Sequence, residues 1–368
     1  MSAPDRHGGN IYAAARELAR HPTRLLDFSA SINPLGPSPR VLRAITRAQD
    51  LLGHYPDPAC LDLRQGLADH HGLDVGQLLI GNGSSELIHL LPRALRINHA
   101  LVVGPTFSEP ERAVRLGGGR VTRVLARRAE HYRPPIGRVL TVLGEKKKAA
   151  MRPDVVFVCN PNSPTGQSIA RDDLAELCEA AGRFRIRVVV DETFVEYCEH
   201  HSILSELRGH RRVLVLRSFT KFYALPGLRA GYVIAAGDAI ESIRESQPPW
   251  SVNALAQIAG LAALHDTGFR RSSLAFMKSE RARLSVQLAQ LPGFIVFPSD
   301  ANFLMVELPP RLAALRLTTW LRLHGLLIRD LSSVHGLTSQ MVRVAVRARQ
   351  DNRHLLRLLG NFLKGFTT

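Results

Sequence analysis

The chain contains 368 residues, of which 45% are hydrophobic, and it carries a formal net charge of +16 at pH 7. It is long and apolar enough to bury a substantial core, and its length predicts one large domain with a smaller one. No apolar run approaches the roughly 20 residues of a membrane-spanning helix, and no charged-then-apolar leader opens the chain. These patterns exclude a membrane partner and favour a cytoplasmic protein.

The positive charge raises the question of a nucleic-acid partner, because strongly basic chains often bind phosphate backbones. The arginines are spread along the chain, however, and no helix-turn-helix or aromatic RNA-binding motif accompanies them. The compact basic run Lys146–Lys148 lies within residues 131–153, a stretch that we predict to be a solvated loop. We therefore expect no nucleic-acid partner, and the distributed charge can instead attract anionic substrates.

The cysteines are too widely spaced for a C-x-x-C metal site. They are Cys60, Cys159, Cys178 and Cys198, and Cys159 lies in an apolar segment. We expect free thiols and no metal.

The predicted elements change character along the chain. An N-terminal arm and an extended segment occupy residues 1–36, and from about residue 40 to about 265 helices alternate with buried strands, as in a doubly wound α/β domain. From about residue 269 apolar residues recur at helical spacing, and short strands are predicted at 294–297 and 303–308. The helical stripe, interpreted as core, is Leu274, Met277, Leu284, Leu288 and Leu291. We therefore predict an arm with the start of the small domain (1–36), a large domain (37–268) and a small α+β domain (269–368).

The first motif is H-G-G-N at His7–Asn10. One interpretation is that His7 and Asn10 close over a ligand pocket from the arm. The other is that this turn only begins a helix, with Asn10 as the N-cap of residues 11–20. The sequence leaves both open.

The segment L-L-I-G-N-G-S-S-E, residues 78–86, passes from a short apolar strand through two glycines into a helix. The backbone N–H groups of the helix start at Gly83, with the hydroxyls of Ser84 and Ser85, form a predicted phosphate cradle. After the next strand, Gly104–Phe107 presents an aromatic side chain. Phe107 is interpreted either as a core residue at a strand end or as a platform that stacks on a ligand ring.

Two further buried strands end in polar residues. D-V-V-F-V-C, residues 154–159, runs into a Pro/Gly turn at Asn160–Gly166, and I-R-V-V-V-D, residues 186–191, ends at Asp191. A continuous run of β-branched residues is typical of a strand buried in a parallel sheet. Because ligand sites in open α/β sheets lie at the carboxyl edge, we expect Asp191 to face such a site.

The most informative motif is S-F-T-K-F-Y-A-L-P-G-L-R-A-G-Y, Ser218 to Tyr232, which places Lys221 between Ser218 and Arg229. An apolar-aromatic setting and nearby positive charge help a lysine to lose its proton near neutral pH, as a Schiff-base lysine must. A hydroxyl and a guanidinium can hold a phosphate dianion. With the carboxylate of Asp191 placed against a pyridine nitrogen, this set predicts a pyridoxal phosphate (PLP) site.

Arginines near the C-terminus are candidates for binding an anionic substrate. The segments G-L-L-I-R and M-V-R-V-A-V-R place Arg329, Arg343 and Arg347 on two predicted strands. Because Arg343 and Arg347 are an even number of residues apart, we expect them to share a strand face. The alternative is that Arg347 is an exposed arginine without a role.

The order and spacing of these motifs resemble fold-type I PLP enzymes of the aminotransferase class I/II family, over essentially the whole chain. Within it, the chain most resembles the threonine-phosphate decarboxylases of cobalamin biosynthesis. The closer resemblance rests on H-G-G-N, on D-F-S-A-S-I-N-P-L-G (27–36), on the lysine motif and on P-W-S-V-N-A-L-A (249–256). Histidinol-phosphate aminotransferases usually carry N-E-N-P where this chain has S-I-N-P at 31–34.

The resemblance implies a mixed, mostly parallel sheet in the large domain and a homodimer with shared sites, because Tyr55 matches a tyrosine that reaches the cofactor phosphate of the neighbouring subunit. Lys221 is implied as the catalytic residue. The cofactor contacts predicted from the residues and the resemblance together are Tyr55, Gly83, Ser84, Ser85, Phe107, Asn162, Ser163, Asp191, Ser218, Lys221 and Arg229. The predicted substrate contacts are His7, Asn33, Arg329 and Arg343.

The chain departs from the family pattern at three positions. Ser163 stands where the usual N-N-P-T-G turn has the asparagine that bonds the PLP ring hydroxyl, and its own hydroxyl can do so directly or through water. Phe194 stands where many aminotransferases have a tyrosine, a change compatible with a decarboxylase. Ser31 replaces a frequent asparagine, which affects the substrate side of that loop.

The residues alone predict a PLP enzyme acting on an anionic amino acid. The resemblance implies decarboxylation of O-phospho-L-threonine to (R)-1-aminopropan-2-yl phosphate, with serine phosphate as another possible substrate. A histidinol-phosphate or related aminotransferase is the alternative enzyme. A PLP-binding regulator on a retired enzyme scaffold is a third hypothesis, opposed by the intact Lys221, Asp191 and Arg229.

Overall fold

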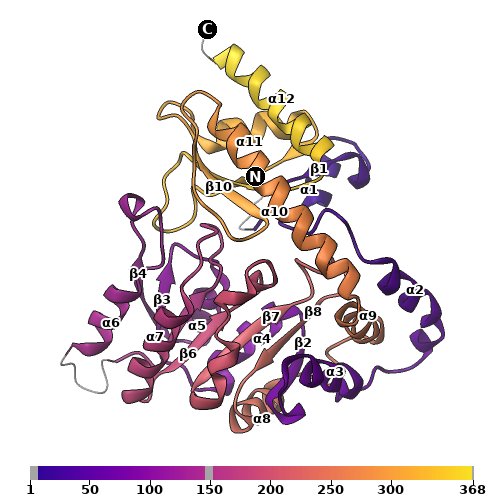
Figure 1. Cartoon of the computed structure of the whole chain (residues 1–368), viewed down its shortest axis with the longest axis vertical. Helices are drawn as coiled ribbons and strands as arrows, with labels where there is room; N and C mark the ends of the chain where they lie inside the picture. Colours follow the sequence, from indigo (N-terminus) through magenta and orange to yellow (C-terminus); the bar gives the residue numbers. More distant parts are fainter. Residues whose placement is uncertain (1–6, 146–151, 367–368) are drawn as a thin grey trace.

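The computed structural model describes residues 7–145 and 152–366 (Figure 1). The predicted basic run Lys146–Lys148 lies outside them. No helix in these two ranges combines the length and the apolar character that crossing a membrane requires.

A seven-stranded sheet forms the centre of the larger half of the molecule. In spatial order its strands are β2 (Leu78–Asn82), β8 (Ala230–Ile234), β7 (Val213–Ser218), β6 (Arg187–Asp191), β5 (Val155–Cys159), β3 (His99–Gly104) and β4 (Arg120–Leu125). Strand β8 runs antiparallel to both neighbours, and all other pairs are parallel. The predicted mixed, mostly parallel sheet is confirmed.

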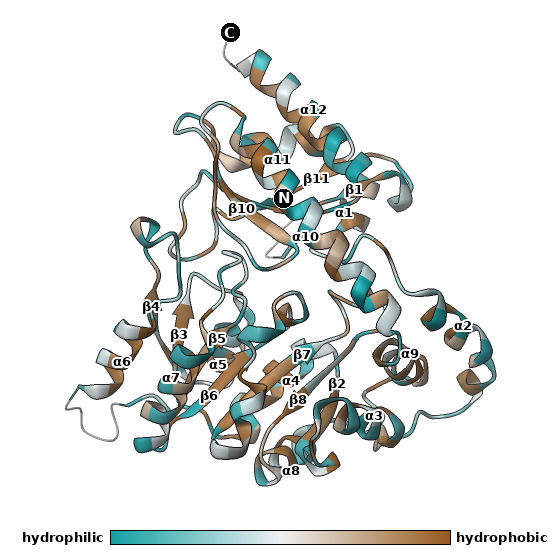
Figure 2. Cartoon of the chain, viewed as in Figure 1, coloured by the Kyte–Doolittle hydropathy of each residue, from teal (hydrophilic) through white to brown (hydrophobic). Residues whose placement is uncertain are grey.

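Helices cover both faces of this sheet, as its apolar strands require. Because side chains alternate along a strand, Leu79 packs on one face and Leu78 and Ile80 on the other. The first face is covered by α4 (Gly83–Ala94), α5 (Glu109–Leu116) and α8 (Gly237–Ser246). The second is covered by α3 (Leu61–His71), α6 (Ile136–Gly144), α7 (Arg171–Arg183) and α9 (Ala254–Leu264), with α2 (Pro39–Arg47) against α9. Figure 2 shows the strands as mainly hydrophobic.

Helix α6 corrects the prediction that residues 131–153 form a loop. The helix begins directly after Pro134 and Pro135, and proline is well tolerated at a helix start, where its missing N–H has no helical partner. Ile136, Val139 and Leu143 recur at helical spacing and are buried. The two prolines, taken as loop signals, instead precede an amphipathic helix.

The smaller half contains an antiparallel sheet and three long helices. The strand order is β12 (Arg329–Asp330), β13 (Met341–Ala345), β10 (Phe303–Glu307) and β9 (Ile295–Val296). Helices α10 (Thr267–Ala289), α11 (Ala314–Leu323) and α12 (Arg349–Phe366) pack on it (Figure 1). A separate parallel pair joins β1 (Leu26–Asp27) to β11 (Leu326–Leu327), so the N-terminal segment lies in this half. The strands predicted at 294–297 and 303–308 correspond to β9 and β10.

Helix α10 links the two halves of the molecule. Met277, Leu284 and Leu288 of the predicted stripe are buried in the core of the smaller half, and Leu291 packs against it. Leu274 instead packs against the core of the larger half. The stripe is therefore core, and a division between 268 and 269 remains our proposal for the domain boundary.

The remaining elements are short. Helix α1 (Ile11–Glu17) ends earlier than the predicted residue 20, and Asn10 caps it by accepting a hydrogen bond from the Ala13 N–H at 3.1 Å. The 3-10 helices span Pro22–Arg24, Gln49–Gly53, Val75–Gln77, Arg128–Glu130, Val195–Tyr197, Glu199–His201 and Leu204–Gly209.

Candidate active site

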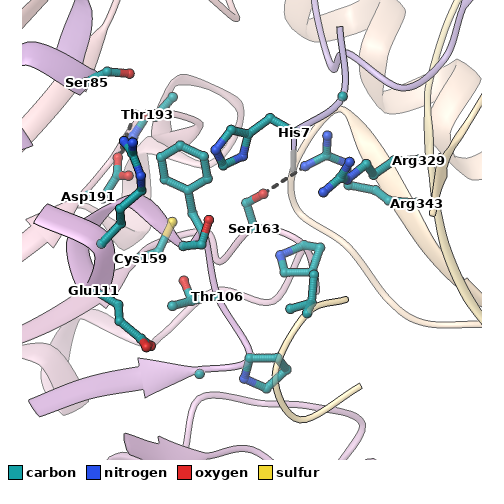
Figure 3. Close-up of a pocket in the computed structure, with 18 of the residues that line it drawn as sticks. His7, Ser85, Thr106, Glu111, Cys159, Ser163, Asp191, Thr193, Arg329 and Arg343 are labelled. Carbon is teal, nitrogen blue, oxygen red and sulfur yellow. Dashed lines mark hydrogen bonds between the residues drawn. The ribbon is translucent and has the colours of Figure 1, made fainter. Parts of the chain in front are cut away.

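A cavity of about 900 Å³ lies where the carboxyl ends of the central parallel strands face the smaller half of the molecule (Figure 3). Eleven of the predicted site residues line it: His7, Ser84, Ser85, Phe107, Ser163, Asp191, Ser218, Lys221, Arg229, Arg329 and Arg343. They come from segments more than 300 residues apart in the sequence. The sheet edge and the two halves together therefore assemble one site.

Lys221 lies in the turn after β7 and reaches the cavity. Burial, followed by the positive charges of Arg343 and Arg229, lowers the pKa of its ammonium from 10.5 to about 8. Its backbone carbonyl accepts a hydrogen bond from the Asn33 N–H at 3.0 Å, which ties this turn to the N-terminal segment. The amine can therefore lose and regain a proton near neutral pH.

Asp191 is the last residue of β6, and its carboxylate is buried at the cavity wall. Its Oδ1 accepts hydrogen bonds from the Thr193 backbone N–H at 3.0 Å and from the Thr193 hydroxyl at 2.5 Å (Figure 3). Burial raises the pKa of Asp191, whereas the two bonds from Thr193 and the charge of Lys221 act in the opposite direction. These contacts favour a carboxylate that is ionised although it is buried.

The start of α4 lies against the guanidinium of Arg229. The first-turn N–H groups of a helix have no partner within the helix. Gly83 has a φ of +75°, and a Cβ there would overlap the Arg229 guanidinium. A Cβ at Gly231 would overlap the backbone nitrogen of Ser84. The two glycines therefore allow a close approach of helix start and guanidinium that suits a phosphate group.

The N-terminal arm contributes His7 and Gly8 to the cavity wall. The His7 ring lies 5.2 Å from the Phe107 ring, measured between centroids. The Nε2 atom of His7 is 2.8 Å from Glu109 Oε1, and His89 of α4 contacts the other carboxylate oxygen at 2.7 Å. Asn10 is the N-cap of α1 and does not line the cavity, whereas His7 does; that these two residues close over a ligand stays a prediction.

Two arginines enter the cavity from paired strands of the smaller half. Arg329 of β12 lies opposite Arg343 of β13 in the antiparallel register. Arg343 donates from Nη1 to the Ser163 hydroxyl at 2.9 Å and from Nη2 to the Ser29 carbonyl at 2.8 Å. Burial, followed by the charge of Arg329, lowers its pKa to about 10. A substrate anion would relieve this repulsion.

Two predicted ligands hold the scaffold and do not line the cavity. Asn33 is buried and donates from Nδ2 to the Phe222 carbonyl at 2.9 Å and to the Ser273 hydroxyl at 2.8 Å. The Nδ2 of Asn162 donates to the Pro105 carbonyl and to the Thr165 hydroxyl, both at 2.8 Å. Both amides join loops that surround the site.

Three other predicted positions also lie off the cavity wall. Gly83 acts only through the backbone described above. Tyr55 is 80% exposed and stacks on Trp250 at 4.7 Å. Strand β13 ends at Ala345, so the prediction that Arg343 and Arg347 share a strand face is wrong. Arg347 does not line the cavity and pairs with Asp351 at 3.0 Å.

Thr193 and Glu109 were not predicted as site residues, and Cys159 was predicted only as a free thiol. Cys159 lines the cavity at the end of β5, opposite Asp191 in the strand register. A threonine two residues after a strand-end aspartate is a local signal, because such side chains readily bond neighbouring backbone and side-chain groups. Nothing in the local sequence links Glu109 to His7, which is 102 residues away.

The donor set fits PLP. An amine with a lowered pKa, a buried carboxylate, an aromatic side chain, and Ser84 and Ser85 of the helix start beside Arg229 surround one cavity. Across residues 7–145 and 152–366, no cluster of three or more His, Cys, Asp or Glu side chains is arranged to hold a metal ion. All four cysteines are buried free thiols.

Comparison with known proteins gives a consistent family. The family model described as "Aminotransferase class I and II" matches residues 23–362. A threonine-phosphate decarboxylase from Salmonella typhimurium is 37% identical over 98% of this chain and 97% of its own length. A histidinol-phosphate aminotransferase from Moorella thermoacetica is 32% identical over 92% of this chain and 86% of its own.

Solved structures of both activities share the fold. The histidinol-phosphate aminotransferase of Clostridium acetobutylicum has a TM-score of 0.85 and 27% identity, covering 93% of this chain and 100% of that one. The L-threonine-O-3-phosphate decarboxylase of Porphyromonas gingivalis has a TM-score of 0.80 and 25% identity, covering 92% and 100%. The chain therefore belongs to the aminotransferase class I and II family.

Proposed function

We propose that this protein is a PLP-dependent decarboxylase that converts O-phospho-L-threonine to (R)-1-aminopropan-2-yl phosphate for the nucleotide-loop linker of cobalamin. The observation that carries the proposal is one cavity in which Lys221 and Asp191 face the paired arginines Arg329 and Arg343. The similarity to threonine-phosphate decarboxylases over nearly the whole chain supports this choice of reaction.

Each side of the cavity has a distinct task. When bound, PLP would accept the electron pair of the bond that breaks at the substrate α-carbon. Asp191 would hold the ring nitrogen, while Ser84, Ser218 and Arg229 would hold the phosphate. Lys221, whose pKa is lowered to about 8, would hold the cofactor aldehyde and then carry a proton on Nζ to the α-carbon.

Substrate orientation falls to the arginines. A phosphorylated amino acid carries a phosphate and a carboxylate, and guanidinium groups bind both through paired N–H donors. Anchoring the substrate phosphate on Arg329 and Arg343 would fix the orientation of the substrate, so that the bond to the carboxylate carbon is the one that breaks. Binding energy far from the reacting carbon thereby fixes its geometry.

A histidinol-phosphate-type aminotransferase is the alternative, because several relatives near 30% identity carry that name. Such an enzyme would use the same lysine and carboxylate but would break a different bond at the substrate α-carbon. O-phosphoserine is a second possible substrate, since one methyl group changes the preference by only about 1 kcal/mol or slightly more.

We further propose a cytoplasmic homodimer in which Tyr55 completes the partner's phosphate site. Tyr55 is 80% exposed beside Trp250, and it does not line the cavity of its own chain. Mixing inactive Lys221→Ala subunits with Tyr55→Ala subunits tests the arrangement. Mixed dimers would contain one intact site and regain activity, whereas sites confined to single subunits would leave the mixture no more active than its parts.

Product analysis tests the reaction itself. The purified PLP-loaded protein is incubated with carboxyl-labelled O-phospho-L-threonine, and in parallel with histidinol phosphate plus 2-oxoglutarate. The proposal expects labelled carbon dioxide and aminopropanol phosphate from the first mixture. Glutamate from the second mixture, with no carbon dioxide from the first, would establish the aminotransferase instead.

A further inference from the structure

The carboxylate of Asp191 is bonded unevenly. Both hydrogen bonds recorded for it go to Oδ1, and both come from Thr193. Among the described residues, no group donates a hydrogen bond to Oδ2. This oxygen is also not one of the fully enclosed polar atoms without a partner, so part of its surface is accessible. Because Asp191 lines the cavity, Oδ2 is the oxygen left for a ligand.

We propose that Thr193 is a positioning residue, whose hydroxyl fixes the Asp191 carboxylate so that Oδ2 is presented, ionised, to the cofactor's ring nitrogen. This inference rests on the proposed function, because it assumes that the cavity holds PLP. It adds a residue outside the cofactor and substrate contacts predicted above.

The local geometry explains how one side chain can do this. Strand β6 ends at Asp191, and Thr193 follows two residues later with its own side chain buried. The backbone N–H and the hydroxyl of Thr193 therefore converge on the same oxygen from one side. Two donors on Oδ1 restrict rotation of the carboxylate, so that Oδ2 has a fixed direction.

The electrostatics point the same way. Burial alone would favour the protonated acid, and a protonated acid could not stabilise a positively charged ring nitrogen. Burial raises the pKa of Asp191 overall, and the hydrogen bonds from Thr193 and the charge of Lys221 oppose that rise. The Thr193 hydroxyl thus favours both the direction and the charge that the ring nitrogen requires.

The competing explanation is that Thr193 only closes the turn after β6. The backbone N–H bond would close the turn with any side chain at position 193, whereas the proposed role needs the hydroxyl. Thr193→Val keeps the N–H bond and the branched shape but removes the hydroxyl, and Thr193→Ser keeps the hydroxyl. Thr318→Val is a matched control: Thr318 is also 8% exposed, and its hydroxyl bonds a helix carbonyl in the smaller half.

The experiment measures the PLP dissociation constant of each holoenzyme and the ring-nitrogen NMR resonance of ¹⁵N-labelled PLP across pH. For Thr193→Val we expect the dissociation constant to rise about tenfold, the effect of roughly one hydrogen bond to a charged group. We also expect its ring nitrogen to lose its proton at lower pH than in the wild type. Thr193→Ser and Thr318→Val should behave as the wild type in both measurements.

Each contrary result has a separate meaning. Wild-type values of both quantities in Thr193→Val would overturn the positioning role and leave the proposed function intact, as would a Thr193→Ser protein that behaves like Thr193→Val. Failure of the wild type to bind PLP would overturn the proposed function itself. The melting temperature without cofactor checks folding. If Thr193→Val does not fold, Thr193→Ala removes the same hydroxyl and decides by the same two readouts.

Discussion

The two sides of the cavity are built in different ways. The cofactor floor, which we define as Ser84, Asp191, Ser218, Lys221 and Arg229, lies at strand ends of one continuous sheet, in the turns beside them and at the start of α4. The substrate clamp, defined as His7, Arg329 and Arg343, comes from the arm and the smaller half. The floor follows the edge of the large sheet, whereas the clamp combines two arginines on paired strands of a second sheet with a histidine held by Glu109. Chemistry and recognition can therefore be perturbed separately.

The largest effect should come from the floor. Replacement of Lys221 by alanine removes the group that we propose holds the cofactor and carries the proton, and we expect kcat to fall roughly a thousandfold or more. Carbon dioxide release from O-phospho-L-threonine measures it. Lys278→Ala, which removes an exposed lysine on α10, should retain full activity. Comparable activity of Lys221→Ala and the wild type would contradict the assignment.

The second-largest effect should come from the clamp, through substrate affinity. In Arg343→Ala we expect kcat/KM to fall roughly a hundredfold, because truncating one partner of a buried charged contact costs about 2–5 kcal/mol or more. Arg347→Ala is the control, since Arg347 pairs with Asp351 and does not line the cavity. Steady-state kinetics measures kcat/KM for both variants. Equal losses in both variants would mean that the clamp is wrongly assigned.

The clamp also acts on the floor through its charge. Because Arg343 contributes to the lowered Lys221 pKa of about 8, Arg343→Gln should raise that pKa. In cofactor-free protein the acetylation rate of Lys221 follows its neutral fraction, so its midpoint should lie near pH 8 and move upward in the variant. Mass spectrometry reports the rate, with Lys278 in the same sample as a reference. An unchanged midpoint would show that the two sides are electrostatically independent.

The smallest effect should come from the contact between Glu109 and His7, which holds the N-terminal arm. Glu109→Gln weakens the contact with His7, and loss of one hydrogen bond corresponds to about a threefold to tenfold rise in KM with little change in kcat. Glu241→Gln, on the surface of α8, changes only an exposed pair with Arg244. A fall in kcat with constant KM would place Glu109 in the chemistry instead.

The floor was the part that the sequence predicted well. Apolar strands ending in Asp191 and Ser218 follow a local pattern, and parallel strands bring their carboxyl ends to one edge. Lys221, Asp191 and Arg229 accordingly line one cavity in the structure.

Contacts between distant segments could not be predicted in the same way. The amide of Asn33 donates hydrogen bonds to Phe222 and Ser273, and Glu109 contacts His7. These residues are far apart in the sequence, and local periodicity does not predict which distant residues meet. The face of Arg347 was mispredicted because the strand ends two residues earlier, at Ala345. Helix α6 was missed because its leading prolines also signal loops.

The most direct test of the central claim, that the clamp selects a phosphorylated amino acid for chemistry on the floor, is the ratio of kcat/KM for O-phospho-L-threonine to that for L-threonine. Carbon dioxide release under identical conditions measures both. A site built to bind a charged group rejects the analogue that lacks it, so we predict a ratio of roughly 10⁴ in favour of the phosphorylated substrate. A ratio near unity would contradict the account.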